Sequence, residues 1–518
     1  MSPVFLLCRS PRRVGVAILG VLAAVVLLAP GELGIHARLA FVVFGAAVYG
    51  WVATSLNDTY VALAAAMSFV LVGIGEPETF FESFGEPTIW LLLGSFVIAA
   101  AAQASGLSNR LAVAVATRAG SVRGLFYALT GALIGTAFVI PSTSGRAALM
   151  VPIFVALASA IEDRRIVRAL ALLIPSVILL SAIASLIGAG AHLVTAEILA
   201  KAGHERLDFG RWLALGAPFA FVSCFLTCWV IQRMFLNAEE RARPLALRAD
   251  QLDGGQHDLT AATGPLSRAE RTVLYIVGAL VLAWCTAPLH GLDNTLVALV
   301  GALAVTAPQA GVVSFKDALK AVDWNILLFL AATLELGESL IESGAAAWLV
   351  DRLLGTLDGP IASSPLVVVA FVALVSLLSH LVINSRTARA SVLVPLIVLL
   401  GLSLGFNPTM LAFLSTAAAG FCLTLPVSAK PVMMFGALDQ PTYEPRDLLR
   451  LSRVLIPAHF VLLVAFAFSV WPALGLSLKG PGDSRVGLPR QVSQTVPVQP
   501  VAYPTIHSSA PADDQGEP

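Results

Sequence analysis

Two polar segments far apart in this chain have nearly the same residues at the same spacing. The first reads PSTSGRAALMVP over residues 141–152, and the second reads NSRTARASVLVP over residues 384–395. Aligning their final prolines pairs three polar positions: Ser142 with Ser385, Ser144 with Thr387, and Arg146 with Arg389. Hydroxyl groups donate hydrogen bonds without adding charge, and a guanidinium fork matches the oxygens of a carboxylate or sulfate. The pair of segments therefore predicts a binding site for a small anion.

Both segments interrupt long apolar runs. Within hydrocarbon, irregular backbone is tolerated only where protein or a water-filled cavity satisfies its N–H and C=O groups. Matching interruptions in two halves of a chain are the best sequence indication of a transporter's binding site. We therefore expect the polar residues of both segments to bind the substrate: Ser142, Thr143, Ser144, Arg146, Ser385, Arg386, Thr387 and Arg389.

The arginines of these segments admit a second interpretation. A helix that starts near Arg146 or Arg389 points its N-terminal amides toward the segment and favours an anion there. A charged side chain at the middle of a bilayer costs about 2.5–3.5 kcal/mol, so each arginine should have a partner. The partner is the substrate if the side chain faces a cavity, and a glutamate or a hairpin carbonyl if it points away. Arg386 aligns with Thr143 and so has no counterpart in the first half.

A second interruption follows each segment, at residues 188–192 and 426–431. These stretches are typical of the unwound middle of a broken helix. Lys430 could replace a coupling cation there, or could extend toward the cytoplasm. His192 could titrate near neutrality, or could be a hydrogen-bonded loop residue. The candidates for coupling-ion binding or gating are Gly188, His192, Glu335, Asn384, Ala429 and Lys430.

Three glutamates share one face of a predicted helix near residues 326–343. Glu335, Glu338 and Glu342 are spaced i, i+3 and i+7. Carboxylates inside a membrane often relay protons. The deeper Glu335 could take a proton or pair with an arginine of the segments, whereas Glu342 lies near the helix end and is expected to meet water. His380, just before the second segment, has the same two interpretations as His192.

The elements that must position these residues are membrane helices. The chain is 57% hydrophobic and 12% charged, with a mean hydropathy of +0.85, far from the balance of a soluble globular protein. Apolar runs recur along most of its length, beginning at residues 14–30. We predict an all-α polytopic membrane protein with about 11 transmembrane helices, two re-entrant hairpins in an inverted repeat, and two broken helices.

The domain boundaries follow from the apolar runs and the charges between them. We expect a cytoplasmic N-terminus at 1–13, scaffold helices at 14–75, a first repeat at 76–236 with a hairpin near 125–161, a cytoplasmic linker at 237–271, a second repeat at 272–475 with a hairpin near 365–402, and a disordered tail at 476–518. The positive-inside rule places the N-terminus in the cytoplasm and the C-terminus outside the plasma membrane. The basic segment 201–211 is an exception to the rule, because the predicted order of spans places it on the outer side of the membrane.

Charge and motifs argue against other classes of protein. Lys and Arg number 32, as do Asp and Glu, so the charge balance predicts no nucleic-acid partner. Cys224 and Cys228 share a helix face without a histidine or carboxylate at ligand spacing, and we expect them to pack in the core. The chain has no H-E-x-x-H or phosphate-loop motif, and no G-x-S-x-G on a predicted strand. We expect no enzyme, no metal site, and no cofactor other than a coupling ion, Na⁺ or H⁺; a membrane enzyme or sensor is the alternative of another class.

At these residues the chain resembles the divalent anion/sodium symporters, the solute carrier family 13 group of dicarboxylate, citrate and sulfate carriers. That family has Ser-Asn-Thr followed by Ala-Thr-Ala at each hairpin tip, which corresponds here to Ser142–Ser144 and Ser385–Thr387. The run ILLFLAATLELGESLIESGAAAWL at 326–349 adds to the resemblance, which covers roughly residues 10 to 475. It implies alternating access and a homodimer in the lipid bilayer.

The chain departs from the family pattern at several positions. Thr143 and Arg386 replace the asparagines, and Arg146 and Arg389 replace the threonines two places after each motif. The Thr-Pro-Pro-Asn of the family's broken helices becomes AGAH at 189–192 and AKPV at 429–432. Family members hold sodium at these loops and tips, and fixed cations nearby would oppose it. The departures therefore argue against sodium coupling, and proton coupling, exchange and a sodium dependence through backbone sites all stay open.

Together these patterns predict a secondary active transporter that carries a small divalent anion, dicarboxylate or sulfate, by alternating access. An arsenite-permease-like carrier or a sodium/proton antiporter of the same superfamily is the alternative. An antiporter would need an Asp or Glu at the breaks, where both segments have arginine instead.

Overall fold

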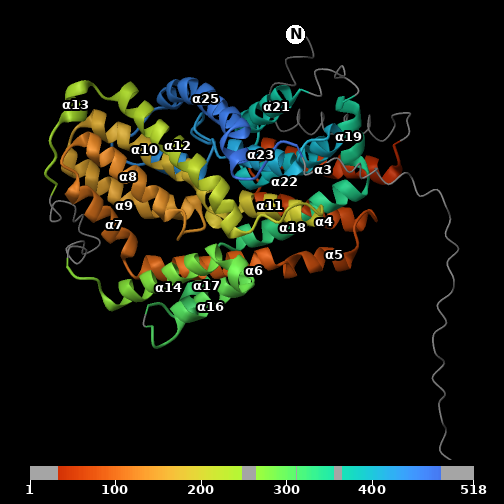
Figure 1. The fold of residues 1–518 in the computed structure, drawn as a ribbon, viewed down its shortest axis with the longest axis horizontal. Coiled ribbons are helices and arrows are strands. Elements are labelled where there is room, and N and C mark those ends of the chain that lie inside the picture. The colour runs from red at the N-terminus through yellow and green to blue at the C-terminus, as the bar shows by residue number, and fades with distance from the viewer. Residues whose placement is uncertain (1–32, 248–263, 311, 355–363, 480–518) are drawn as a thin grey trace, which may run out of the picture. The chain divides into compact units, whose positions relative to one another are not determined.

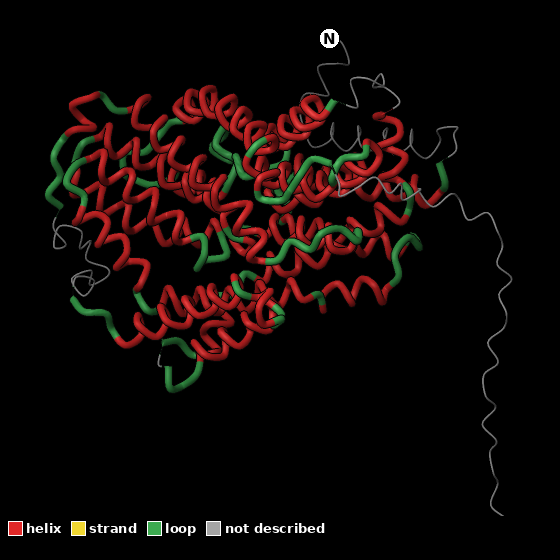
Figure 2. The backbone as a smooth tube through the Cα atoms, in the orientation of Figure 1, coloured by secondary structure: helices red, strands yellow, loops and turns green. Residues whose placement is uncertain are grey.

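The computed structural model describes residues 33–247, 264–310, 312–354 and 364–479. These residues form helices joined by turns, and their β-structure amounts to two isolated bridges, Ser121 with Pro244 and Phe406 with Lys479. Figure 2 shows the helices and their connections. The predicted all-α class is confirmed. The expected first span at 14–30 and the expected tail from residue 480 onward lie outside the described residues.

The helices follow one another in two series (Figure 1). The first series is α3 (Ile35–Ala53), α4 (Asp58–Leu71), α5 (Pro77–Glu82), η1 (Ser83–Gly85), α6 (Pro87–Ala104), α7 (Leu107–Arg118), α8 (Val122–Thr136), α9 (Thr143–Ile161), α10 (Arg164–Ser181), η2 (Ala182–Ala184), η3 (Leu186–Gly188), α11 (Gly190–Lys201), α12 (Phe209–Phe235) and α13 (Ala238–Ala242). The second series is α14 (Arg268–Cys285), α15 (Ala287–His290), α16 (Asn294–Thr306), α17 (Phe315–Lys320), α18 (Trp324–Glu342), α19 (Ala345–Leu354), α21 (Pro365–Leu378), η6 (Ser379–Leu381), α22 (Arg386–Leu404), α23 (Pro408–Ala419), α24 (Lys430–Gly436), α25 (Pro445–Phe468) and α26 (Val470–Ala473).

Many of these helices are apolar enough for a bilayer. Among the described residues, 8 helices have the length and hydropathy of a membrane span, and shorter apolar helices accompany them. The shorter ones include α8 and α21, the first arms of the two expected hairpins. A helix of 15 residues, such as α8, rises only about 22 Å and cannot cross about 30 Å of hydrocarbon alone. The total of about 11 spans stays a prediction.

The two series share a repeat that begins earlier than the polar segments. Residues 56–63 read LNDTYVAL and residues 292–299 read LDNTLVAL, a match that the sequence analysis missed. Asn57 caps α4 by accepting from the amides of Thr59 and Tyr60, and Asp293 caps α16 in the same way. The threonine of each motif then donates to the start of another helix: Thr59 to the Asn325 carbonyl at 2.9 Å, and Thr295 to the Pro87 carbonyl at 3.2 Å.

Packing between the two series is reciprocal. Helix α4 packs on α18, while its counterpart α16 packs on α6. Helix α11 packs on α22 and α23, while its counterpart α24 packs on α9 and α10. Each half thus covers the equivalent surface of the other half, which is the arrangement that a repeat with a pseudo-two-fold axis produces.

Burial is greatest at α10, whose residues from Ala169 to Ser181 are all buried. It lies among α8, α9 and α12, in the larger of two hydrophobic clusters. The smaller cluster joins α3 and α4 to α18 and α19. These clusters hold the helices that carry the polar segments, so the segments are presented by rigid elements.

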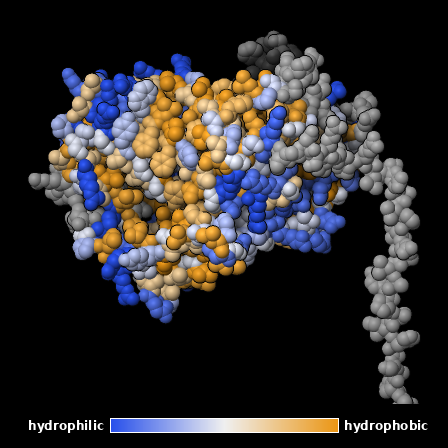
Figure 3. All heavy atoms as spheres, viewed as in Figure 1, coloured by the Kyte–Doolittle hydropathy of each residue, from blue (hydrophilic) through white to orange (hydrophobic). Residues whose placement is uncertain are grey.

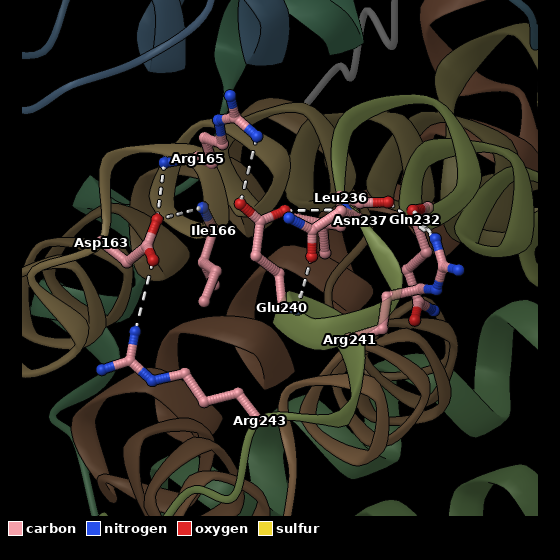
Figure 4. A network of polar contacts seen from close by, with 9 residues as sticks. All are labelled: Asp163, Arg165, Ile166, Gln232, Leu236, Asn237, Glu240, Arg241 and Arg243. Atoms are coloured by element: carbon pink, nitrogen blue, oxygen red, sulfur yellow. Dashed lines mark hydrogen bonds and ion pairs between the residues drawn. The ribbon is translucent and has the colours of Figure 1, made fainter.

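The chain leaving α12 is tied to the turn before α10 (Figure 4). Asn237 and Glu240 form a capping box at α13, and Glu240 also meets Arg165 at 3.4 Å. Asp163 caps α10 and pairs with Arg243 at 3.3 Å. Ion pairs therefore connect the start of α10 with the first residues of the expected cytoplasmic linker.

Large apolar side chains are exposed on several helices, and Figure 3 shows apolar residues covering a broad area of one face. The exposed residues include Leu274, Tyr275 and Leu282 on α14 and Leu366, Phe371 and Leu374 on α21. In water such an area would be unfavourable, whereas lipid hydrocarbon solvates it.

A basic residue of the expected exception at 201–211 has acidic partners. Lys201 lies 3.2 Å from Glu86, in the acidic stretch 76–86, and 2.9 Å from Glu338. Its charge is therefore balanced locally, and the predicted topology stays a prediction.

Candidate functional site

Residues of both polar segments line one cavity of about 380 Å³. The tip between α8 and α9 contributes Pro141, Ser142, Thr143 and Ser144, and the tip between η6 and α22 contributes Asn384, Ser385, Arg386, Thr387 and Arg389. Ala189, Gly190, Ala429 and Lys430, from the two breaks, complete the expected part of the lining. Four stretches that are distant in sequence thus meet at one cavity.

The serines at the two tips have equivalent positions. Ser142 caps α9 and accepts a hydrogen bond from the amide of Gly145 at 3.2 Å. Ser385 caps α22 and accepts from the amide of Ala388 at 3.3 Å. Each cap fixes the start of a helix at the cavity, where the N-terminal amides favour negative charge. The Ser142 hydroxyl still has its proton to donate, whereas the Ser385 hydroxyl also forms a hydrogen bond with Asp58.

Arg389 is fully buried and lines the cavity. Its Nη2 lies 2.7 Å from the Sγ of Cys422, whereas its Nε and Nη1 have no hydrogen-bond partner among the described residues. Arg386 donates from Nη2 to the carbonyls of Leu179 and Gly420 at 3.3 and 3.4 Å, and its Nη1 has no partner among the described residues either. A buried cation without its hydrogen bonds is costly, and a small oxyanion in the cavity can supply them.

Arg146 lies outside this cavity, although it aligns with Arg389. It is 1% exposed. Its guanidinium donates to Thr136 Oγ1 at 2.9 Å, to the Ile178 carbonyl at 3.0 Å, to Ser181 Oγ at 2.7 Å and to the Leu133 carbonyl. The geometry does not support the expected substrate contact. Helices α8 and α10 end here, and Arg146 adds a second donor to the Leu133 and Ile178 carbonyls, which also accept from the hydroxyls of Thr136 and Ser181.

Three of the coupling or gating candidates also lie away from the cavity. A Cβ at Gly188 would come within 2.2 Å of the Ala182 carbonyl oxygen, so the turn after η2 requires glycine. His192 Nδ1 bonds the Ser185 carbonyl at 3.0 Å, and its ring stacks on Trp212. Glu335 is 1% exposed, accepts from Ser339 at 3.1 Å, and keeps Oε2 without a partner among the described residues.

His380 also has a structural environment. Its Nδ1 bonds the Leu377 carbonyl at 2.7 Å, and its Nε2 bonds Thr424 Oγ1 at 2.7 Å. Because a carbonyl oxygen can only accept, Nδ1 holds the proton. His380 therefore joins the second tip to the unwound stretch before α24.

The two breaks have the same backbone conformation. Ala189, which precedes α11, has φ −159° and ψ 149°, and Ala429, which precedes α24, has φ −159° and ψ 147°. Neither helix start has a side-chain cap from the described residues. At Gly190 a Cβ would lie 3.3 Å from Thr387 Oγ1, so the start of α11 approaches the second tip closely.

Several cavity residues were not predicted. They are Asn57, Asp58, Thr59, Asp323, Asn325 and Cys422. Asp58 forms a hydrogen bond with Ser385 and interacts electrostatically with Lys430, so a carboxylate lies near the exposed ammonium. The repeated LNDT and LDNT motifs could have pointed to Asn57, Asp58 and Thr59. Nothing in the apolar run around Cys422 marks it as a site residue.

Comparison with known proteins finds transporters. A family model described as the sodium:sulfate symporter transmembrane region matches residues 12–477. The sodium-dependent dicarboxylate transporter SdcS of Staphylococcus saprophyticus is 25% identical over 476 residues, covering 85% of this chain and 88% of that protein. A protein of Cupriavidus necator described as a membrane protein is 24% identical over 399 residues, 76% of each chain.

Solved transporter structures share the fold. MtrF of Neisseria gonorrhoeae, described as illuminating a class of antimetabolite efflux pumps, has a TM-score of 0.54 at 11% identity and covers 89% of this chain and 100% of that chain. The YdaH transporter of Alcanivorax borkumensis has a TM-score of 0.50 at 15% identity and covers 78% and 89%. The resemblance that the two polar segments indicated is confirmed by the family match over most of the chain. This chain therefore belongs to the sodium:sulfate symporter family of membrane transporters.

Proposed function

We propose that the chain is a secondary active transporter of small divalent anions, dicarboxylate or sulfate, and that the cavity between the two tips binds the anion. One observation supports this above all: Arg386 and Arg389 line the cavity, and each has a buried guanidinium nitrogen without a hydrogen-bond partner and no carboxylate ion pair among the described residues. Relatives described as dicarboxylate transporters and the family description agree with this substrate class.

The cavity has the size and polarity for such a cargo. Its volume of about 380 Å³ is at the small end of ligand pockets, roughly 300–1,000 Å³. Ser142, Ser144, Ser385 and Thr387 offer hydroxyl donors around the two arginines. The helix starts of α9, α11 and α22 add partial positive charge to the same space. A compact dianion fits this environment better than a cation or a neutral solute.

The coupling ion is proposed to differ from that of the relatives named sodium-dependent. Arg386, Arg389 and Lys430 surround the second tip and break. These fixed cations repel a sodium ion and already supply the positive charge that sodium would bring to a dianion. We therefore propose transport driven by protons or by a counter-anion, without a sodium requirement.

Alternating access would follow from the repeat. The reciprocal packing of the two series supports an inverted repeat whose halves present the cavity in turn to each side. With the N-terminus in the cytoplasm, the starts of α4 and α18, which line the cavity at Asp58 and Asn325, face the cytoplasm. The conformation described here is then open inward. A homodimer in the plasma membrane is proposed as for the family.

Uptake into proteoliposomes tests the proposal. The purified chain is reconstituted, and labelled succinate or sulfate is supplied outside with an inward sodium gradient, an inward proton gradient, or the counter-anion inside. Uptake of either anion with the proton gradient or the counter-anion, at equal rates in sodium and potassium buffers, is expected. Transport that occurs only with sodium would contradict the coupling proposal, and transport of neither anion would contradict the substrate class.

A further inference from the structure

The thiol of Cys422 is an ionisable group in contact with the two arginines that line the cavity, Arg386 and Arg389. It lies in the unwound stretch between α23 and α24, lines the cavity and is 1% exposed. Its Sγ is 2.7 Å from Arg389 Nη2, and Arg386 also interacts with it through charge and hydrogen bonding. The Ala419 carbonyl lies 3.4 Å from Sγ and can accept a hydrogen bond only when the thiol is protonated. None of the ion pairs among the described residues joins either arginine to a carboxylate.

The two arginines beside this thiol lack some of their hydrogen-bond partners. Arg389 is 0% exposed, and two of its nitrogens have no partner among the described residues. Arg386 Nη1 also has no partner among the described residues. Burial disfavours the charged form of a thiol, whereas neighbouring guanidinium groups favour it, and their attraction for a thiolate is stronger at low dielectric than in water. A thiolate would satisfy the arginines in a way that a neutral thiol cannot.

The other titratable groups around the thiol do not compete for this role. Three histidines stand nearby: His380 on η6, His192 on α11 and His459 on α25, whose ring packs on Phe421. Each is buried and bonds a backbone carbonyl through Nδ1. Of the charged groups lining the cavity, Asp58 on α4 interacts with Ser385 and Lys430, and Asp323 lies just before α18. Neither carboxylate forms an ion pair with the two arginines within the described residues.

We propose that Cys422 is a thiolate that neutralises Arg386 and Arg389 in the substrate-free cavity and takes up one proton when a dianion binds to them. The inference rests on the proposed anion site. Two guanidinium groups and one thiolate leave a single positive charge. When a dianion binds, the thiolate and the anion repel each other, and Sγ accepts a proton from the cavity water. Two guanidinium groups, a neutral thiol and a dianion then sum to zero.

Transport coupling follows from this exchange. The proton remains on Sγ while the dianion occupies the arginines, and it returns to water on the side where the dianion leaves. One proton therefore crosses the membrane with each dianion. The device needs no change in the oxidation state of sulfur and no bound metal.

Proton uptake on binding is the direct test. Sulfate is titrated calorimetrically into the detergent-solubilised full chain at pH 7 in Bis-Tris and in Tris, which differ in ionisation enthalpy, and the difference in heat counts the protons bound. Sulfate remains a dianion at this pH and takes none itself. We expect about one proton per sulfate in the wild type and about none in Cys422→Ser, with sulfate bound in both. Equal proton uptake in the two proteins would overturn the inference and leave the proposed function standing.

A second measurement needs no substitution at Cys422. In a Cys8→Ser, Cys285→Ser background, the rate of modification by methanethiosulfonate reagents is followed by mass spectrometry from pH 5 to 9. A thiolate between cations should react at pH 6 at nearly its pH 8 rate, should prefer the anionic sulfonatoethyl reagent over the cationic trimethylammonium reagent at least tenfold, and should be protected by sulfate. A rate that rises about tenfold per pH unit with no charge preference, as for a free thiol, would overturn the inference. Failure of the wild type and of Cys422→Ser to bind either sulfate or succinate would instead contradict the proposed function.

Discussion

Arg146 and Arg389 occupy the same position in two aligned segments but have different surroundings. Arg146 donates to four oxygens at the ends of α8 and α10. Arg389 lines the cavity and contacts one sulfur atom, and two of its nitrogens are buried without a partner among the described residues. One arginine therefore holds the fold together, while the other is available to a ligand. This contrast makes the pair a matched test of the site.

Replacing Arg389 by alanine should weaken sulfate or succinate binding without harming the fold. A hydrogen bond to a charged group contributes about 1.5–3 kcal/mol, so the affinity should fall roughly 10- to 100-fold. Because two of the three guanidinium nitrogens have no partner among the described residues, and Cys422 can take up a proton when Arg389 is removed, the unfolding temperature should stay the same or rise. Calorimetric binding and thermal unfolding of the detergent-solubilised chain measure both quantities. Arg389→Lys, which keeps the charge but not the fork, should bind with intermediate affinity; binding at the wild-type level in Arg389→Ala would exclude it from the site.

Replacing Arg146 by alanine should have the opposite pattern. Several buried acceptors lose their donor, and each unsatisfied group costs about 1–3 kcal/mol, so the unfolding temperature should drop by several degrees or the yield of folded protein should collapse. The fraction that folds should bind sulfate within about twofold of the wild type. Unchanged stability combined with a loss of sulfate binding would contradict this structural role and indicate that Arg146 binds the substrate.

At the scale of elements, the breaks before α11 and α24 decide where the helix starts lie. Ala189 and Ala429 share one extended conformation, and the turn before α11 depends on a close backbone approach at Gly188. Gly188 was a candidate for coupling-ion binding, but the contact between it and the Ala182 carbonyl gives it a structural reason to be glycine.

A Gly188→Ala substitution should be strongly destabilising, because its Cβ would meet the Ala182 carbonyl oxygen at 2.2 Å. We expect a loss of about 3 kcal/mol or more, the upper end for single substitutions. Gly131→Ala in α8 is the matched control, since no atom outside its own helix lies within 4 Å of the added Cβ, and it should be neutral or stabilising by up to about 1 kcal/mol. Thermal unfolding of the two variants in one detergent compares them. Equal stability of the pair would show that the turn can relax.

At the scale of the whole molecule, the reciprocal packing of the two series organises the cavity. Helix α5 in the first series corresponds to α17 in the second, and each precedes the helix that receives a threonine from the other half. Both helices are short, and each has an exposed acidic residue, Glu78 in α5 and Asp317 in α17. An inverted repeat requires that these two similar helices lie on opposite sides of the membrane.

Labelling of single cysteines can check this orientation. In the background lacking Cys8 and Cys285, Glu78→Cys should react with a membrane-impermeant maleimide on intact cells. Asp317→Cys should react only after the membrane is permeabilised, because the proposed topology places α17 in the cytoplasm. Each variant is the control for the other. Labelling of both sites on intact cells would contradict the inverted arrangement.

The class of the protein could be predicted from sequence because the determinants are local. Apolar runs fix a membrane helix, and a polar break within a run requires a protein or water environment wherever it lies. Two matching breaks therefore predicted a shared cavity, and residues 142–144, 384–387 and 389 line it. The family was readable for the same reason, since its motif residues lie within a few positions of one another.

The tertiary structure alone decided which of two equivalent arginines faces the cavity. Arg146 and Arg389 have nearly the same neighbours in sequence, but of the two only Arg146 meets helix C-termini, whose carbonyl and hydroxyl oxygens satisfy its guanidinium. The same applies to Cys422 and Asp58, which come to the cavity from an apolar run and from the start of α4. Their positions depend on contacts between helices hundreds of residues apart, and the packing of distant surfaces is not encoded in any short stretch of residues.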